Sequence, residues 1–90
     1  MAVGILMNIA CTQDQYDAVI RDLETAGAGA PPGRLYHVAG PIDGGWRVLD
    51  VWESPASFEA FAPTLLPITQ KHAVPPFQPE VFLAHNIIAG

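Results

Sequence analysis

The stretch Trp46–Pro55 constrains the fold of this chain more than any other, because it encodes a strand that ends directly at a helix. Side chains along a strand point alternately to its two faces. Leu49 and Val51 therefore share one face, and both are apolar. Asp50 and Trp52 share the other face, which also carries apolar bulk. Because neither face is polar throughout, we expect this strand to lie in a sheet that is covered on both sides.

A helix is expected to follow this strand without a loop. Ser54 is a preferred N-cap residue, and Pro55 suits the first helical position, where its missing N–H is harmless. Apolar residues at helical spacing predict the inner face of this helix: Phe58, Phe61, Ala62 and Leu65. Pro63 and Pro67 are expected to kink the helix or divide it into two pieces, since each removes a backbone hydrogen bond.

The N-terminal third of the chain predicts a strand and then a helix. Residues 2–10 form a nearly continuous apolar run, which indicates a central strand buried on both faces. Residues 12–15 fit a capping box. An apolar stripe follows at helical spacing and predicts the inner face of a helix: Tyr16, Val19, Ile20 and Leu23. Tyr16 is expected in the core as a member of this stripe, and Gly27 is expected to end the helix.

The remaining strands are separated by segments rich in glycine and proline. Residues 34–39 predict a second strand, and the Asp-Gly pair at 43–44 predicts a hairpin turn that joins it to the strand at 46–53. Residues 80–88 predict the last strand, after a stiff proline-rich linker at 74–79.

The resulting order, βαββαβ, is the ferredoxin-like arrangement of an α+β protein with a four-stranded antiparallel sheet. Ninety residues allow a single domain, so residues 1–90 are expected to form one unit. Two helices cover only one face of such a sheet, yet 50% of the residues are hydrophobic and only 14% are charged. We therefore expect a homodimer, in which the uncovered face packs against the same face of a second chain and a closed pocket lies between the sheets.

The charge pattern argues against nucleic acid and membrane partners. The net charge is −5, and the four basic residues are scattered: Arg21, Arg34, Arg47 and Lys71. Binding to a phosphate backbone or an anionic membrane surface needs clustered basic residues. One cysteine allows no internal disulfide, and neither a signal-like N-terminus nor a membrane-length apolar run is evident. A cytoplasmic protein is therefore expected.

The order of elements and the run Val51-Trp52-Glu53-Ser54, followed by Phe58 and Phe61, resemble the dimeric α+β barrel superfamily. The likeness is greatest to its antibiotic biosynthesis monooxygenase-like branch. This resemblance implies a homodimer with one ligand cavity per subunit, between sheet and helices or inside the barrel. Some relatives oxidise polyketide-like aromatic compounds with molecular oxygen and no metal or flavin, while others cyclise, degrade haem or have no known activity. The oxygenases are described with an Asn and a Trp in the cavity, and Asn8 and Trp52 are the positions that match.

His37 and Asp50 form the strongest candidate for chemistry. If the hairpin loop has an even number of residues, the register places His37 opposite Asp50 and Leu35 opposite Trp52. Cross-strand neighbours on one face have Cβ atoms about 4.5–5.5 Å apart. Such a pair suits a general base that removes a phenolic or enolic proton, with Trp52 as a flat wall for a planar substrate. Alternatively, His37 and Asp50 only satisfy each other, since a buried acid needs a partner, and an odd loop would place His37 on the opposite face.

His85 and Asn86 are neighbours in the last predicted strand, so only one of them can face the pocket. We expect Asn8 or Asn86 to stabilise an oxyanion, although a core or interface role is the alternative for His85 and Asn86.

No paired His or Cys spacing indicates a metal site, and no cofactor is expected. The leading prediction is a cofactor-independent monooxygenase-like enzyme for a planar or aromatic metabolite. A non-catalytic ligand-binding or accessory protein, and a cyclase or isomerase with the same pocket, are the alternatives.

Overall fold

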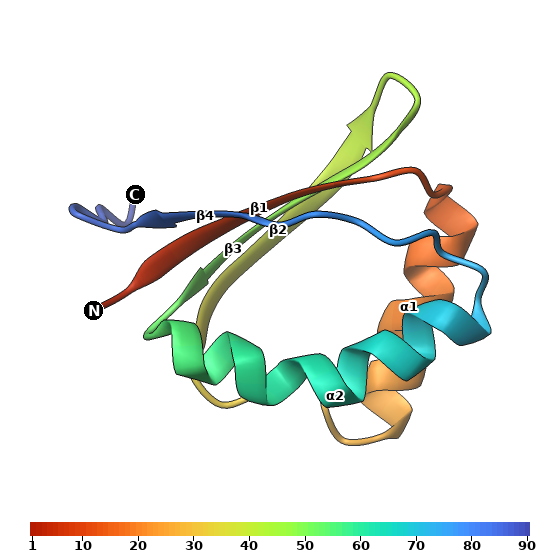
Figure 1. Cartoon of the computed structure of the whole chain (residues 1–90), viewed down its shortest axis with the longest axis horizontal. Helices are drawn as coiled ribbons and strands as arrows, with labels where there is room; N and C mark the ends of the chain where they lie inside the picture. The colour runs from red at the N-terminus through yellow and green to blue at the C-terminus, as the bar shows by residue number, and fades with distance from the viewer.

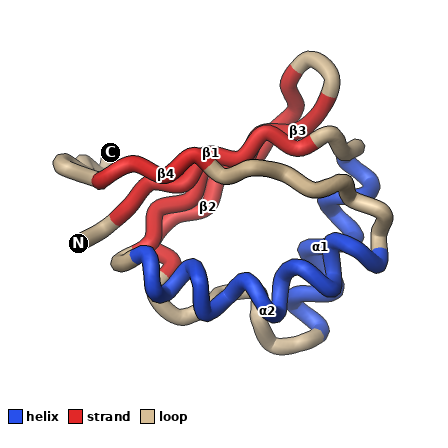
Figure 2. The backbone as a smooth tube through the Cα atoms, in the orientation of Figure 1, coloured by secondary structure: helices blue, strands red, loops and turns tan.

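The computed structural model describes residues 1–90 and contains six elements in the predicted order. These elements are β1 (Val3–Ile9), α1 (Gln13–Thr25), β2 (Arg34–Ile42), β3 (Gly45–Trp52), α2 (Pro55–Lys71) and β4 (Glu80–Leu83). The strands form one antiparallel sheet in the order β2-β3-β1-β4. Both helices lie on the same side of this sheet (Figure 1, and blue in Figure 2). The predicted ferredoxin-like α+β fold is confirmed.

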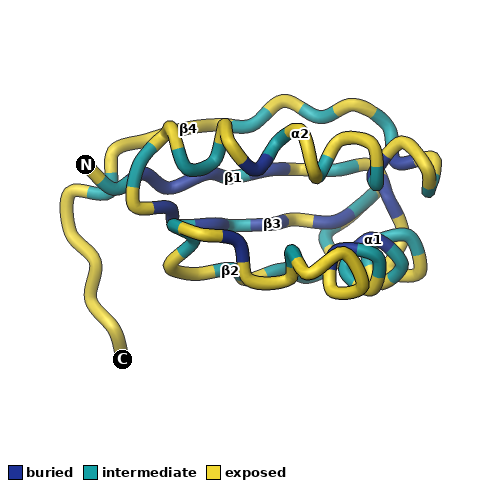
Figure 3. The backbone as a smooth tube through the Cα atoms, turned by 90° about the horizontal axis from the view of Figure 1, so that it is seen from below, coloured by how far each residue is buried: buried dark blue, intermediate teal, exposed yellow.

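The core lies between the two central strands and the helices, and the buried stretches concentrate on β1 and β3 (Figure 3). Trp52 is fully buried, at 0% exposure. Its ring packs against two rings of α2, with centroid distances of 5.6 Å to Phe58 and 5.5 Å to Phe61. The predicted inner face of α2 therefore contacts β3 through this aromatic cluster.

Side-chain caps fix the start of α1 and connect it to the end of α2. The predicted capping box is present, because Gln15 N donates to Thr12 Oγ1 at 3.2 Å and Thr12 N donates to Gln15 Oε1 at 2.9 Å. The side-chain nitrogen of Gln15, Nε2, also donates to the backbone carbonyls of His72 and Ala73, at 3.1 and 3.2 Å. One side chain thus holds both helix ends. Gly27 follows the helix with a φ of 75°, as its predicted role requires.

The β2–β3 hairpin has a two-residue turn, Asp43-Gly44, because Ile42 pairs with Gly45. Gly44 has a φ of 77°, a conformation that a turn residue adopts easily when it lacks Cβ. β2 is longer than predicted and includes Pro41. A proline is tolerated there because β2 is an edge strand, on which one missing N–H breaks no essential ladder.

The register confirms one pair of predicted neighbours and corrects the other. His37 lies opposite Asp50, as an even loop requires. A β-bulge between Arg34 and Tyr36 then shifts the register, so Arg34 rather than Leu35 lies opposite Trp52. The prediction for Leu35 is therefore wrong, and this side chain is 51% exposed.

The structure excludes one of the two expected effects of the prolines in α2 and corrects the end of the last strand. α2 is one helix and is not divided at Pro63 or Pro67, both on its exposed side, where water can reach the carbonyls that lose their N–H partners. The last strand ends at Leu83 rather than at residue 88. Its final partner is Val3, the first residue of β1, so β1 offers no further strand residues for pairing.

The face of the sheet away from the helices is apolar and bare in the single chain. Leu49 and Val51 lie on this face, partly buried. Several large apolar side chains are exposed on or beside it: Tyr36, Val38, Phe82, Ile87 and Ile88. No helix of this chain has the length and hydropathy that a bilayer-spanning segment needs.

Candidate active site

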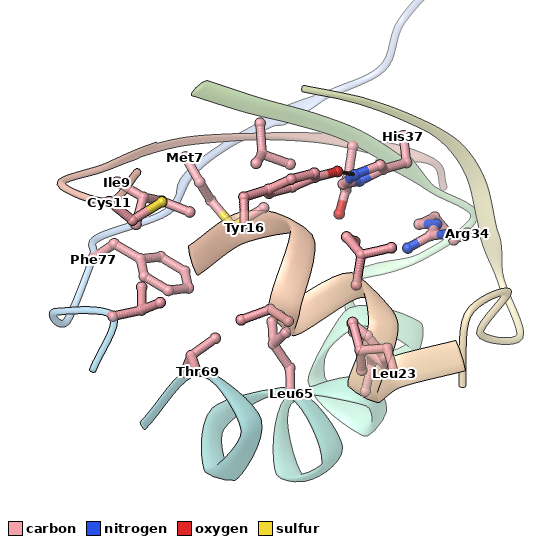
Figure 4. Close-up of a pocket in the computed structure, with 16 residues that line it drawn as sticks. Met7, Ile9, Cys11, Tyr16, Leu23, Arg34, His37, Leu65, Thr69 and Phe77 are labelled. Carbon is pink, nitrogen blue, oxygen red and sulfur yellow. Dashed lines mark hydrogen bonds and ion pairs between the residues drawn. The ribbon is translucent and has the colours of Figure 1, made fainter. Parts of the chain in front are cut away.

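A cavity of about 70 Å³ lies between the inner face of the sheet and the two helices. Twelve of the 16 residues that line it are hydrophobic. The chain therefore contains a pocket of its own, between sheet and helices. Arg34 and His37 lie toward one end of the cavity, while Cys11 and Phe77 lie toward the other (Figure 4). Asp50 is the one carboxylate among the lining residues.

The hairpin brings His37 of β2 and Asp50 of β3 into direct contact. His37 Nδ1 and Asp50 Oδ1 are 2.6 Å apart, and Asp50 is only 4% exposed. An ionised carboxylate can only accept hydrogen bonds, so Nδ1 carries the proton and donates it. The other ring nitrogen, Nε2, is then the acceptor in the neutral imidazole. The contact is a short, charge-assisted hydrogen bond at the cavity wall.

Trp52 supports this pair but does not form a wall of the cavity. Its indole Nε1 donates to the second carboxylate oxygen, Asp50 Oδ2, at 3.2 Å. Because Phe58 and Phe61 pack against its ring, Trp52 is not among the residues that line the cavity. The structure thus places Trp52 behind the site, where it orients Asp50, rather than against a substrate.

Tyr16 is a site residue that the sequence did not reveal. Its hydroxyl lies 2.5 Å from His37 Nε2, and its ring is parallel to the imidazole within 4°. With a neutral His37, Nε2 is the acceptor and the tyrosine hydroxyl is the donor. The available signal was modest: Tyr16 is the single member of the α1 stripe that has a polar end.

The surroundings of Tyr16 keep its phenol protonated. Burial raises the pKa of Tyr16 above its ordinary value, and the negative charge of Asp50 raises it further. The guanidinium of Arg34 acts in the opposite direction. A protonated phenol is the form that donates to His37, so these effects favour the observed hydrogen bond.

Tyr16, His37, Asp50 and Trp52 therefore form one chain of hydrogen bonds with a consistent direction. With a neutral His37, Tyr16 donates to His37, His37 donates to Asp50, and Trp52 donates to the other oxygen of Asp50. Both nitrogens of His37 are occupied. A ligand in the cavity consequently reaches this base through the Tyr16 hydroxyl or by displacing that hydroxyl. The arrangement is a hydroxyl, a base and an orienting acid, which can transfer a proton.

Three other predicted site residues do not reach this cavity. Asn8 lies on the opposite face of the sheet, where its side-chain oxygen accepts from Arg47 Nε at 2.8 Å. His85 and Asn86 follow the end of β4 and are exposed. Asn86 borders a groove on the outer face of the sheet. The structure therefore does not place an asparagine beside His37.

The far end of the cavity offers no second reactive cluster. Cys11 is buried there, and burial raises the pKa of its thiol. No set of three or more His, Cys, Asp or Glu side chains is placed to hold a metal ion. The polar chemistry of the cavity is concentrated at the end that contains His37.

Solved structures share this fold, although no protein-family model and no curated protein sequence matches the chain. A mutant of SnoaB, a cofactor-independent oxygenase from Streptomyces nogalater, matches with a TM-score of 0.68 and 16% identity over 99% of this chain and 98% of SnoaB. A mutant of MhuD with two manganese protoporphyrin IX molecules per active site matches with a TM-score of 0.59 and 22% identity over 100% of both chains. The hydroxynitrile lyase from Passiflora edulis matches with a TM-score of 0.54 and 16% identity over 98% of this chain and 96% of the lyase.

The chain thus has the fold of antibiotic biosynthesis monooxygenase-like proteins, as the sequence resemblance indicated. An oxygenase, a porphyrin-binding protein and a lyase all share this fold. The fold does not select among reactions, so the function has to be argued from the site.

Proposed function

We propose that this protein is a cofactor-independent monooxygenase-like enzyme that acts on a planar or aromatic, polyketide-like metabolite in the cavity between the sheet and the helices. The observation that carries the proposal is the hydrogen-bonded chain Tyr16–His37–Asp50 at one end of an apolar cavity. A base held by an acid and surrounded by apolar walls suits the removal of a weakly acidic proton.

The reaction follows from the chemistry of an enolisable substrate. Tyr16 donates its proton to His37 and takes one from an activated methylene group or from the enol form of the substrate. Asp50 stabilises the imidazolium that results. The electron-rich carbanion transfers electrons to oxygen and forms a carbon–oxygen bond, which gives a hydroperoxide. Loss of water from the hydroperoxide leaves a carbonyl, so one methylene and one O2 become one carbonyl and one water.

The cavity volume favours small substrates. Pockets for drug-sized ligands have volumes of about 300–1,000 Å³, whereas this cavity has about 70 Å³. Binding of even a two-ring compound therefore requires movement of wall residues. Phe77, which lies in the linker before β4, and Leu65 of α2 are wall side chains on separate segments, and we expect these two side chains to move apart when a ligand binds. We expect compounds of one or two rings to bind better than larger polycyclic ones.

Proton exchange tests the base directly and needs no oxygen. Under anaerobic conditions in D2O, we expect the protein to accelerate deuterium exchange at the activated methylenes of 2-indanone and 2-tetralone, measured by NMR. His37→Ala and Asp50→Ala should abolish the acceleration, while His85→Gln, an exposed histidine outside the cavity, should retain it. Oxygen uptake and a carbonyl product after admission of air then test the oxygenase. If deuterium exchange and oxygen uptake both survive in His37→Ala and in Asp50→Ala, the roles proposed for these two residues are refuted.

The two alternative functions give different results in the same experiments. A cyclase, isomerase or lyase would show base-dependent exchange without oxygen uptake, and the hydroxynitrile lyase shows that this fold supports chemistry other than oxygenation. A non-catalytic ligand-binding or accessory protein would bind the ketones without either activity. Quenching of tryptophan fluorescence reports that binding, because Trp46 packs against Tyr16 at a centroid distance of 5.2 Å.

We also propose that the protein works as a cytoplasmic homodimer that pairs through the outer face of its sheet. The support is the bare apolar surface that includes Val38 and Phe82. Val38→Asp should give a monomer in sedimentation velocity, since it buries a charge in the interface. Leu66→Asp, at an exposed apolar position on α2, is the matched control and should leave the dimer intact. A wild-type monomer at micromolar concentration would refute the pairing.

A further inference from the structure

We propose that Arg34 is an oxyanion-binding residue, which makes the cavity selective for weakly acidic phenols and enols that it binds as their anions. This inference rests on the cavity being the ligand site of the proposed function. It does not depend on any reaction with oxygen. Arg34 is among the residues that line the cavity, on the same side as His37 (Figure 4).

A local irregularity of the backbone brings Arg34 to this position. His37 faces the inner side of the sheet, so regular alternation along β2 would place Leu35 inward and Arg34 outward. The bulge between Arg34 and Tyr36 reverses this order and places Arg34 opposite Trp52, on the inner face. Leu35 is exposed instead. Bulges beside active sites commonly redirect a side chain in this way.

The guanidinium has no anionic partner within the chain. Its one hydrogen bond runs from Nη2 to the carbonyl of Gly29, at 2.8 Å, and no carboxylate forms a salt bridge with it. A guanidinium has five N–H donors in a planar fork that matches an oxyanion. Arg34 is only partly exposed, its hydrogen bond to Gly29 lies at the surface, and most of the other residues that line the cavity are apolar. A cation in such a place gains from an anion that forms beside it in the cavity.

Charge balance specifies the kind of anion. With a neutral His37, the charges of Arg34 and Asp50 cancel before a ligand reacts, so a ligand that enters uncharged is preferred. When the proton of that ligand passes through Tyr16 to His37, two cations face Asp50 and one new oxyanion. The cavity is neutral in both states. A carboxylate arrives with its charge and leaves an excess negative charge, so phenols and enols should bind better than carboxylic acids.

The probe is 4-nitrophenol, because its absorbance reports whether the bound molecule is ionised. Its neutral analogue is 4-nitroanisole, and 4-nitrobenzoate is the carboxylate of similar size. In the wild-type protein we expect the bound phenol to ionise at a lower pH than the free phenol, and we expect 4-nitrobenzoate to bind more weakly than 4-nitrophenol, which enters uncharged. Arg34→Gln should weaken binding of the phenolate about 10- to 100-fold, the range for a lost hydrogen bond to a charged group. Binding of 4-nitroanisole should not change.

Three further variants separate charge from packing. Arg21→Gln removes the same charge from an exposed position on α1 and should leave phenolate binding intact. Arg34→Lys retains the charge without the fork and should bind phenolate with intermediate strength. The double substitution Arg34→Leu with Leu35→Arg keeps the composition and net charge but moves the cation to an exposed position that does not line the cavity, so it should bind phenolate as weakly as Arg34→Gln. Thermal unfolding by circular dichroism checks that each variant folds.

Several results would overturn the inference. They are absence of 4-nitrophenol binding to the wild type, unchanged phenolate binding in Arg34→Gln, and an equal loss for 4-nitroanisole, which would indicate packing alone. Failure of the oxygenase is a separate outcome. Phenolate binding that depends on Arg34, without proton exchange or oxygen uptake, would support this inference and refute the proposed reaction.

Discussion

Asp50→Asn tests the geometry of the site most directly, because it changes the hydrogen-bonding chemistry of Asp50 with almost no change in shape. The carboxylate accepts from His37 Nδ1 at 2.6 Å and from Trp52 Nε1 at 3.2 Å, with a different oxygen for each donor. An asparagine amide has one oxygen acceptor and one NH2 donor at these two positions. The amide oxygen can therefore accept from only one of the two N–H groups, His37 Nδ1 or Trp52 Nε1. The amide NH2 then lies against the other N–H, donor against donor, unless His37 changes its tautomer.

The burial of Asp50 and Trp52 determines how much Asp50→Asn destabilises the protein. Trp52 is 0% exposed and Asp50 is 4% exposed, so water cannot replace the lost acceptor. A buried donor without a partner costs about 1–3 kcal/mol, and loss of the charge on the His37 contact adds to this, so we expect about 2–3 kcal/mol of destabilisation. A change of 1 kcal/mol shifts the Tm of a domain of this size by about 4–8 °C, which predicts a decrease of about 8–24 °C.

Thermal and urea unfolding, followed by far-UV circular dichroism, measure this effect. Asp43→Asn is the matched control, because it makes the same chemical change at the exposed hairpin turn and should alter stability by about 0.5 kcal/mol or less. A double-mutant cycle with Trp52→Phe removes the donor that the amide would oppose. The combined loss should be smaller than the sum of the single losses, with a coupling of about 0.5–3 kcal/mol.

Two results would contradict this description of the site. Asp50→Asn could match the control, or its effect could add to that of Trp52→Phe without coupling. Either outcome would mean that Trp52 does not hold Asp50. The assignment of donors and acceptors along Tyr16, His37 and Asp50 would then lose the support that the Trp52 contact gives it.

Two further predictions concern stability. Gly4→Ala places a Cβ against the end of the exposed Phe82 ring, which has to move aside, so it should lower the Tm modestly, whereas Gly40→Ala enters open space and should leave the Tm unchanged. Hydrogen bonds from His72, and to a smaller extent from Lys71, lower the pKa of Asp22. The stability that they contribute is therefore present at pH values above the ordinary carboxyl pKa and is lost as the pH falls through the lowered pKa. Asp22→Asn should therefore flatten the acid side of the stability–pH curve measured by urea unfolding, and an unchanged curve would refute the linkage.

Most of the fold could be predicted because its signals are local. The capping box at Thr12, the Asp43-Gly44 turn and the cap at Ser54 each fix an element boundary within a few residues of sequence. The turn also determines which residues of the hairpin face each other. Its even length is what placed His37 opposite Asp50, and this is why the central pair of the site could be predicted without a structure.

The rest of the site depends on features that leave little trace in the sequence. The bulge beside Leu35 has no composition of its own, so a regular register placed the wrong residue at the cavity. Both faces of β1 are apolar, so periodicity could not show that Asn8 points away from the helices. Tyr16 fits a core stripe equally well with or without a hydrogen bond. These features depend on tertiary structure, and each one determines whether a residue belongs to the cavity.

The polar end of the cavity is built by two independent units of the fold. Arg34, His37 and Asp50 all come from the β2–β3 hairpin, so its turn and its bulge place them together. Tyr16 comes from α1, whose start is fixed by a separate cap. A change in the hairpin register should therefore abolish base and oxyanion binding at once, whereas Tyr16→Phe should slow proton exchange and leave the affinity for a phenolate largely intact. If Tyr16→Phe instead removed phenolate binding as completely as Arg34→Gln, the hydroxyl rather than the guanidinium would be the group that holds the oxyanion.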